Sequence, residues 1–229
     1  FALLAMVFVL SSFLDNIGRN REARIEHQAA LDAARLCNDM SMRCDILANL
    51  GVSYMDSGLP RLAAQALEDS VRTRRLHELN LGGGTALLTL GQALRAIGEY
   101  SASIVHTEAQ RTSWMEERPS FVCICDYSLA TSSLHLGQLA RAQQVIRAAA
   151  VSPEIAAGVR AKFLVVHARL ADALGQPTAL LLRQADQLLA PDDLHGTYWR
   201  QLQLEWSLAL EPAEALTRAR AVLAVTEKS

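Results

Sequence analysis

The amino-acid sequence predicts an all-α chain, an α-α superhelix (solenoid) of about six stacked antiparallel helix hairpins. Three observations predict it: an Ala- and Leu-rich composition, a glycine that recurs about every forty residues, and no strand-like alternation. Hydrophobic residues make up 51% of the 229 residues, whereas aromatic residues make up only 5%. Strands favour β-branched and aromatic residues, while Ala and Leu lose little entropy in a helix. We expect one continuous repeat domain over residues 1–229, as part of a larger protein.

The recurring glycine marks the turn of each hairpin. Each copy follows one apolar run with helical spacing and precedes another. Glycine adopts positive φ at little cost, so it is suited to end the first helix. The five copies are Gly18, Gly58, Gly98, Gly137 and Gly175, separated by 40, 40, 39 and 38 positions. A sixth copy has Leu210 in the place of the glycine.

The elements follow in order from this repeat. First helices are predicted over 1–16, 42–56, 83–97, 120–135, 157–174 and 196–209. Second helices are predicted over 20–38, 60–77, 100–116, 139–150, 178–189 and 212–226. The hairpins therefore lie near 1–39, 42–79, 83–117, 120–151, 157–190 and 196–227.

Small residues and prolines support the same division. A small residue five positions after the glycine lets the two helices approach: Ala23, Ala63, Ser103, Ala142 and Ala215. In the fifth copy Ala179 comes one position early, which indicates a small deletion. Pro60, Pro177 and Pro212 are expected at the start of second helices, where a missing N–H costs nothing. Pro119, Pro153 and Pro191 are expected between hairpins.

The first helices carry apolar sets spaced along one face. Two copies read Leu47, Leu50, Gly51, Tyr54 and Leu87, Leu90, Gly91, Leu94, and the last reads Trp199, Leu202, Trp206. This pattern resembles the tetratricopeptide (TPR) W-x2-L-G-x2-Y motif over nearly the whole chain. The period near 40 exceeds the usual 34. That longer form is similar to the helical-repeat regions of maltose-regulon and LuxR-type bacterial transcription activators, and to arrays beside cyclase and kinase domains in bacterial signalling proteins. A helical bundle with coincidental glycines is the alternative.

Charge and cysteine usage exclude several classes of protein. A net charge of −2 supplies no strong field for nucleic acid or anionic membranes. Four scattered cysteines do not make a disulfide scaffold, so we expect a reducing, cytoplasmic setting. Redox pairing of Cys37 with Cys44 is the alternative there.

No motif predicts catalysis, a cofactor or a metal. The cluster Gly82–Gly84 lacks the Lys and the Ser/Thr of a phosphate-binding loop. Cys123 and Cys125 point to different sides of a predicted helix, and zinc needs convergent ligands. The histidines are dispersed (His27, His77, His106, His135, His167 and His195), and His167 occupies a slot that Leu50 and Leu90 fill elsewhere, so we expect it in the core. We therefore predict no enzyme.

The TPR resemblance implies a concave groove lined by the first helices, and so a binding function. Carried onto this sequence, its groove-facing slots hold Gln92, Arg95, Tyr127, Thr131, Lys162, Arg169, Asp172 and Arg200. With four cations and one carboxylate, this strip is expected to bind an acidic protein or peptide segment or a small anionic effector. Solvated polar side chains without a ligand are the alternative. The predicted function is a regulatory scaffold in a bacterial transcription or signalling protein; the alternative is a dimerisation or sensor input domain attached to a cyclase or kinase output domain.

The N-terminal run FALLAMVFVL is apolar on every side of its predicted helix. Ten residues are too few to span a bilayer, which needs about 20. A membrane or secretion role would need a basic segment upstream. Because wet apolar surface is unfavourable, we expect upstream repeats or a second copy of the chain, in a homodimer, to cover this helix.

Overall fold

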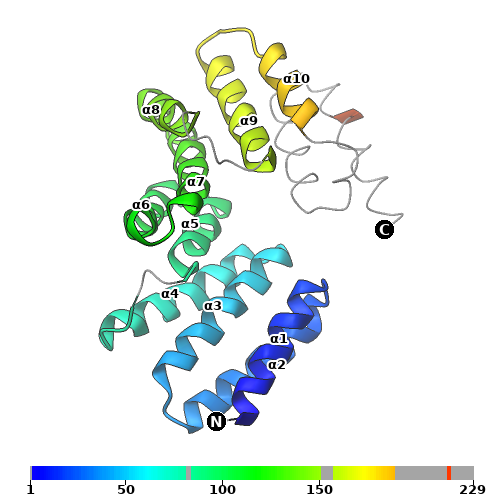
Figure 1. The fold of residues 1–229 in the computed structure, drawn as a ribbon, viewed down its shortest axis with the longest axis vertical. Coiled ribbons are helices and arrows are strands. Elements are labelled where there is room, and N and C mark those ends of the chain that lie inside the picture. The colour runs from blue at the N-terminus through cyan, green and yellow to red at the C-terminus, as the bar shows by residue number, and fades with distance from the viewer. Residues whose placement is uncertain (1, 81–83, 151–156, 189–215, 218–229) are drawn as a thin grey trace. The chain divides into compact units, whose positions relative to one another are not determined.

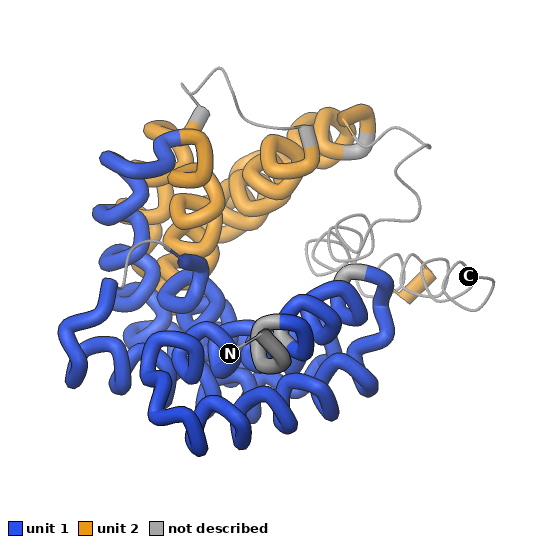
Figure 2. The backbone as a smooth tube through the Cα atoms, turned by 60° about the horizontal axis from the view of Figure 1, so that its bottom comes forward, with its two compact units in different colours: residues 1–119 blue, residues 120–229 orange. Residues whose placement is uncertain are grey.

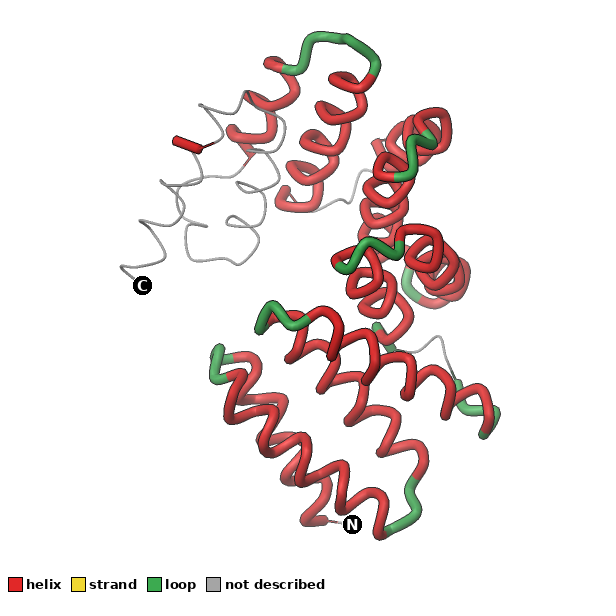
Figure 3. Tube along the Cα trace, turned by 180° about the vertical axis from the view of Figure 1, so that it is seen from behind, coloured by secondary structure: helices red, strands yellow, loops and turns green. Residues whose placement is uncertain are grey.

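The computed structural model describes residues 2–80, 84–150, 157–188 and 216–217, and every regular element in these ranges is helical (Figures 1 and 3). The chain divides into two compact units, residues 1–119 and 120–229 (Figure 2). That the whole chain forms one domain stays a prediction. Several expectations fall outside the described residues: the sixth hairpin apart from residues 216–217, Gly82, Gly83, Pro153, Pro191, Pro212, Ala215 and Arg200.

The first unit holds three hairpins. Its helices are α1 (Ala2–Asn16), α2 (Asn20–Leu36), α3 (Met40–Asp56), α4 (Pro60–Leu76), α5 (Ala86–Ala96) and α6 (Tyr100–Glu117). Consecutive helices pack on one another, and first helices of neighbouring hairpins also touch, α1 on α3 and α3 on α5. The described helix ends lie within about three residues of the predicted ones.

The second unit repeats the arrangement. After the short 3-10 helix η1 (Pro119–Phe121) come α7 (Val122–His135), α8 (Leu139–Ala150), α9 (Ala157–Ala173) and α10 (Ala179–Leu188). Within this unit α7 packs on α8, α9 packs on α10, and α9 also contacts both α7 and α8. None of the helices in the described ranges is long and apolar enough to cross a membrane.

The predicted turn glycines all have positive φ. Their values lie between 68° and 89°. At the third turn, the N–H of Glu99 donates to the carbonyl of Leu94 at 2.8 Å and that of Gly98 donates to Arg95 at 3.1 Å. These bonds satisfy carbonyls that the end of the helix would leave unpaired. The glycine therefore ends each first helix by the mechanism expected from the sequence.

In the second and third hairpins, the two helices approach closely at a glycine of the first helix. Ala23, Ala63, Ser103 and Ala142, each five positions after a turn glycine, are fully buried. On the opposite helix, a Cβ added to Gly51 would collide with the side chain of Leu67, and one added to Gly91 with Thr107. The glycine and the small residue together set the close approach of the helices.

The fifth turn differs from the prediction. Helix α10 begins at Ala179, four positions after Gly175, whereas α4 begins at Pro60, two positions after its turn glycine. Ala179 is exposed, and α10 is buried through Leu182 and Ala185 instead. The predicted deletion is therefore wrong, because this turn carries two extra residues.

The prediction that Pro177 lies at the start of the second helix of this hairpin is also wrong. Pro177 precedes α10 and does not start it, and the carbonyl of Thr178 accepts the first helical hydrogen bond, from Leu182, at 3.2 Å. A proline disfavours helical backbone at the residue before it, so the turn is extended here.

Candidate functional site on the first-helix faces

Helix α5 carries the two predicted groove residues of the first unit. Gln92 and Arg95 are spaced by three residues, so they lie on one face, and both side chains are half-buried. The rotation of α5 is set by its opposite side, where Leu87, Leu90 and Leu94 pack in a core shared with α4. That core turns the amide and the guanidinium away from α4.

Helix α7 carries two residues that prove to be buried. The hydroxyl of Thr131 donates to the carbonyl of Tyr127 at 2.8 Å, inside the same helix. The ring of Tyr127 meets that of Phe163 on α9 edge to face, with centroids 6.1 Å apart. Tyr127 and Thr131 therefore serve packing in this structure and offer little surface to a ligand.

Helix α9 carries two cations and a carboxylate from the predicted strip. Lys162 is buried, and its ammonium lies 5.4 Å from the centroid of the Tyr127 ring, within the range of a cation–π contact. Arg169 is half-buried, with its guanidinium 3.4 Å from Nε2 of His135. Asp172 is exposed. The structure thus brings Lys162 and Tyr127 together and adds His135, which sequence reasoning had not placed at the site.

The strip is distributed over both units. Gln92 and Arg95 belong to the first unit, and Tyr127, Thr131, Lys162, Arg169 and Asp172 belong to the second. Arg200 lies outside the described residues. Ligand binding by this strip stays a proposal. The residues of the strip with accessible side chains are Gln92, Arg95, Arg169 and Asp172.

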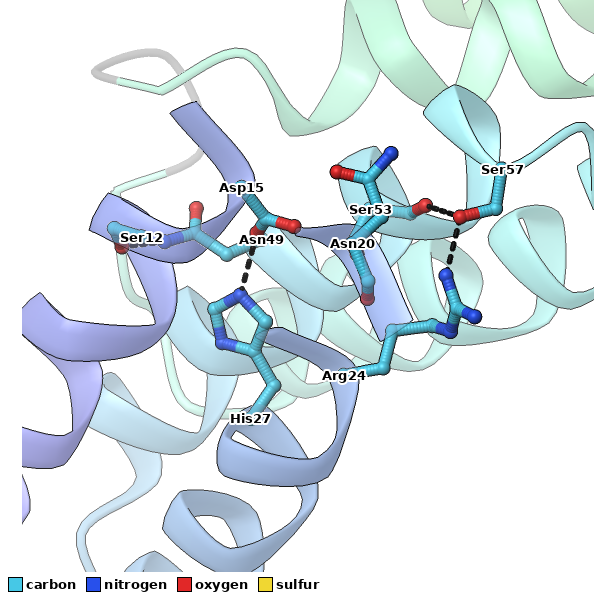
Figure 4. Close-up of polar contacts among 8 residues, drawn as sticks. All are labelled: Ser12, Asp15, Asn20, Arg24, His27, Asn49, Ser53 and Ser57. Carbon is cyan, nitrogen blue, oxygen red and sulfur yellow. Dashed lines mark hydrogen bonds and ion pairs between the residues drawn. The ribbon is translucent and has the colours of Figure 1, made fainter. Parts of the chain in front are cut away.

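A polar cluster between α1, α2 and α3 was missed from the sequence (Figure 4). Nε2 of the fully buried His27 lies 2.8 Å from Oδ2 of Asp15. The amide of Asn49 donates to the hydroxyl of Ser12 at 3.1 Å, and Arg24 donates to Ser57. The sequence carries one signal of this cluster. Nine positions after the turn glycine the first copy has His27, whereas the next three copies have Leu67, Thr107 and Ile146.

The carboxylates of Asp15 and Asp56 interact at this end of the first unit. Partial burial raises the pKa of the Asp56 carboxyl above its ordinary value, and the charge of Asp15 raises it further.

The structure also tests the other candidate residues. His167 is exposed, so its expected place in the core is wrong: α9 buries Phe163, Val166 and Leu170 on one side and Ala161, Val165 and Ala168 on another, which leaves His167 outside both. Cys37 is exposed, Cys44 is buried, and the two are not bonded. In the described part of the chain, no group of three or more His, Cys, Asp or Glu side chains is arranged to hold a metal ion.

The chain repeats one helix hairpin, in which a glycine ends the first helix and small residues lie where the helices meet. This arrangement defines a helical-repeat protein. Its fold is that of TPR-like repeat solenoids, as two solved structures show. The TPR-like repeats of a Podosopora anserina protein described as a kinesin light chain align with a TM-score of 0.64 and 19% identity, over 81% of this chain and 94% of that one. A substituted form of those repeats aligns with a TM-score of 0.66 and 20% identity, over 83% of this chain and 96% of that one. No family model and no curated protein match the sequence.

Proposed function

We propose that the chain is a protein-interaction scaffold whose first-helix faces bind a carboxylate-bearing peptide segment of a partner protein. Two features support this proposal: the TPR-like fold, which presents a row of first helices, and cationic side chains on those helices. The proposal needs no catalytic group. It follows the acidic-ligand hypothesis drawn from the sequence, with a smaller set of contact residues.

The observation that carries the proposal is the environment of Arg169. Among the described residues no carboxylate lies within ion-pair distance of its guanidinium, which faces the imidazole of His135 instead. A neutral imidazole nitrogen accepts one hydrogen bond and leaves the positive charge uncompensated. A half-buried guanidinium with donors to spare is suited to bind a carboxylate in a bidentate manner.

Lys162 reinforces this charge. It lies seven residues before Arg169 on α9, so the two side chains share a face about two turns apart. The Tyr127 ring holds the ammonium in place, so it acts as a fixed positive charge. In the first unit Arg95 and Gln92 form the corresponding pair of a cation and an amide on α5.

A peptide titration tests the proposal. Labelled peptides rich in Asp and Glu are compared with Asn/Gln versions of the same sequences by fluorescence anisotropy. We expect the acidic peptides to bind and Arg169→Ala to weaken them about tenfold, the usual effect of losing one hydrogen bond to a charged group. Arg95→Ala tests the cation of the first unit separately from that of the second.

The matched controls are arginines on second helices. Arg147→Ala on α8 and Arg72→Ala on α4 remove exposed cations of the same units and should leave the affinity unchanged. Equal binding of the acidic and amide peptides, or equal loss in all four variants, would contradict the proposal.

The cellular context is also a proposal. The long repeat resembles the regulatory regions of bacterial transcription activators, which would make this chain a cytoplasmic regulatory module. The alternative is an input domain that dimerises an attached cyclase or kinase. Sequencing the complete gene separates them, since an ATPase with a helix-turn-helix supports the first and a cyclase or kinase domain the second. Homodimerisation through the N-terminal helix stays a prediction. Sedimentation of the purified chain measures the oligomeric state and so tests it.

A further inference from the structure

The end of α7 and the second half of α9 bring a histidine and an arginine together in the second unit. Nη2 of Arg169 lies 3.4 Å from Nε2 of His135, so the guanidinium donates to the imidazole nitrogen. The two side chains come from different helices, which are in contact. His135 is exposed and Arg169 is half-buried, so a ligand can reach both side chains from solvent.

The distance between the two nitrogens fits one carboxylate oxygen. A charge-assisted hydrogen bond from N–H to a carboxylate oxygen is about 2.7–2.9 Å long. One oxygen can lie at that distance from two nitrogens that are 3.4 Å apart, so it can accept from both. The second oxygen then reaches another N–H of the planar guanidinium. Arg169 and His135 can therefore bind one carboxylate together.

The protonation of His135 decides whether this position accepts a carboxylate. In the structure Nε2 accepts from Arg169, so this nitrogen presents a lone pair. A carboxylate oxygen beside that lone pair is repelled, whereas a protonated imidazole donates from both of its nitrogens. The imidazolium and the guanidinium would repel one another at this distance, and a carboxylate bound between them compensates both charges.

The other charged groups of the helices packed here do not titrate near neutral pH, with one exception. Helices α8 and α9 both contact α7. On α9 the carboxylate of Asp172 follows Arg169 by three residues, on the same face and exposed. Asp, Lys and Arg ordinarily titrate outside the range from about pH 6 to pH 8. The exception is His167 on α9, and the remaining charged residues of the three helices are Asp126, Arg141, Arg147, Arg160 and Lys162.

We propose that His135 is a second binding residue for the carboxylate that Arg169 binds, and that this ligand binds together with a proton. The imidazole takes the proton from solvent at Nε2 and donates it in a hydrogen bond to the carboxylate, beside the guanidinium. Affinity for an acidic segment therefore rises as the pH falls through the range in which histidine titrates. The inference rests on the proposed function and adds a residue and a pH dependence to the same site.

A peptide titration at two pH values tests the inference on the full chain. The probe is a rhodamine-labelled peptide of alternating Glu and Ala with an amidated C-terminus, whose carboxylates stay ionised at both pH values. We expect binding to be about three- to fivefold tighter at about pH 6 than at about pH 8, the usual contribution of an exposed charge pair. Calorimetry in buffers of different ionisation enthalpy should show net proton uptake on binding.

Two variants assign the proton to its residue. His135→Gln should remove most of the pH dependence and of the proton uptake, because an amide accepts from Arg169 but does not titrate. His167→Gln is the matched control and should leave both readouts unchanged. It removes an exposed histidine two residues before Arg169, which therefore lies on another side of α9. Circular dichroism at both pH values checks that all three proteins are folded.

Two results would overturn the inference alone. One is binding of the acidic peptide with equal affinity at both pH values and no proton uptake. The other is a pH dependence that His135→Gln retains or that His167→Gln removes. Failure of the acidic peptide to bind at either pH would instead remove the proposed function, and this inference with it.

Discussion

His27 and Asp15 form a buried pair across the first turn, with imidazole Nε2 and carboxylate Oδ2 2.8 Å apart and no exposed surface on the His27 side chain. The pair joins the end of α1 to the middle of α2. In the second and fourth copies an apolar side chain, Leu67 or Ile146, fills the place of the histidine. A polar pair in a core position is stable only as long as both partners remain.

Removing one partner of this pair should therefore cost more than removing both. We expect Asp15→Ala to lower the free energy of unfolding by about 1–3 kcal/mol, because a buried imidazole loses its hydrogen bond. The double change Asp15→Ala with His27→Leu should recover much of that loss, since it restores the apolar residue of the other copies. Denaturant titration of the three proteins measures it, and a double variant less stable than Asp15→Ala would contradict the account.

Gly91 should not tolerate a methyl group. A Cβ there would collide with the hydroxyl of Thr107 and lie 3.1 Å from the carbonyl of Ser103. We expect Gly91→Ala to destabilise the chain by about 1–3 kcal/mol, despite the better helix propensity of alanine. Gly158→Ala in α9 is the control, because nothing lies within 4 Å of that Cβ. Thermal melts in which both changes stabilise the protein would refute a close helix contact at Gly91.

Backbone conformation at the turns makes an independent prediction. Gly58 has φ of +69° with open space around it, so Gly58→Ala adds only backbone strain, about 1 kcal/mol. Gly58→Asn should cost less, since asparagine tolerates this region, as Asn38 does with φ of +52°. Glu78 has φ of +53°, so Glu78→Gly should stabilise the chain. Chemical denaturation of the three variants measures their free energies of unfolding. We expect the highest value for Glu78→Gly, a lower one for Gly58→Asn and the lowest for Gly58→Ala.

Asp56 should make stability depend on pH. Burial and the charge of Asp15 raise its pKa, so the folded chain binds a proton at Asp56 more readily than the unfolded chain does. The ionised carboxylate is therefore unfavourable in the fold, and stability falls as pH rises through the raised pKa. We expect Asp56→Asn to raise the melting temperature at pH 7 and to lose this advantage in acid, below both pKa values. A gain that persists unchanged in acid would contradict this origin.

The turns and helices were predictable because their causes are local. A residue with positive φ, a proline without an N–H and an apolar run with helical spacing act within a few positions of the chain. Gly18 to Gly175 therefore marked the hairpins correctly. The fifth turn was misread because Ala179 was matched by residue type, whereas the start of α10 depends on how Pro177 extends the loop before it.

The candidate site was less predictable, because it depends on which side of each helix is covered. A count of positions from Gly175 placed His167 in the core, but the faces of α9 that contact its neighbours use other residues. The groove-facing slots implied by the TPR resemblance placed Tyr127 and Thr131 on a binding surface, and packing buries both.

The amino-acid sequence by itself determined the order of hairpins, the places where helices end and the small residues that bring them together, since each follows from short-range sterics and hydrogen bonding. Only the tertiary structure decided that His27 meets Asp15 and that Lys162 lies over Tyr127. Those contacts join different helices, so they depend on how the helices rotate and cross when they pack, and side-chain spacing along one helix does not specify that.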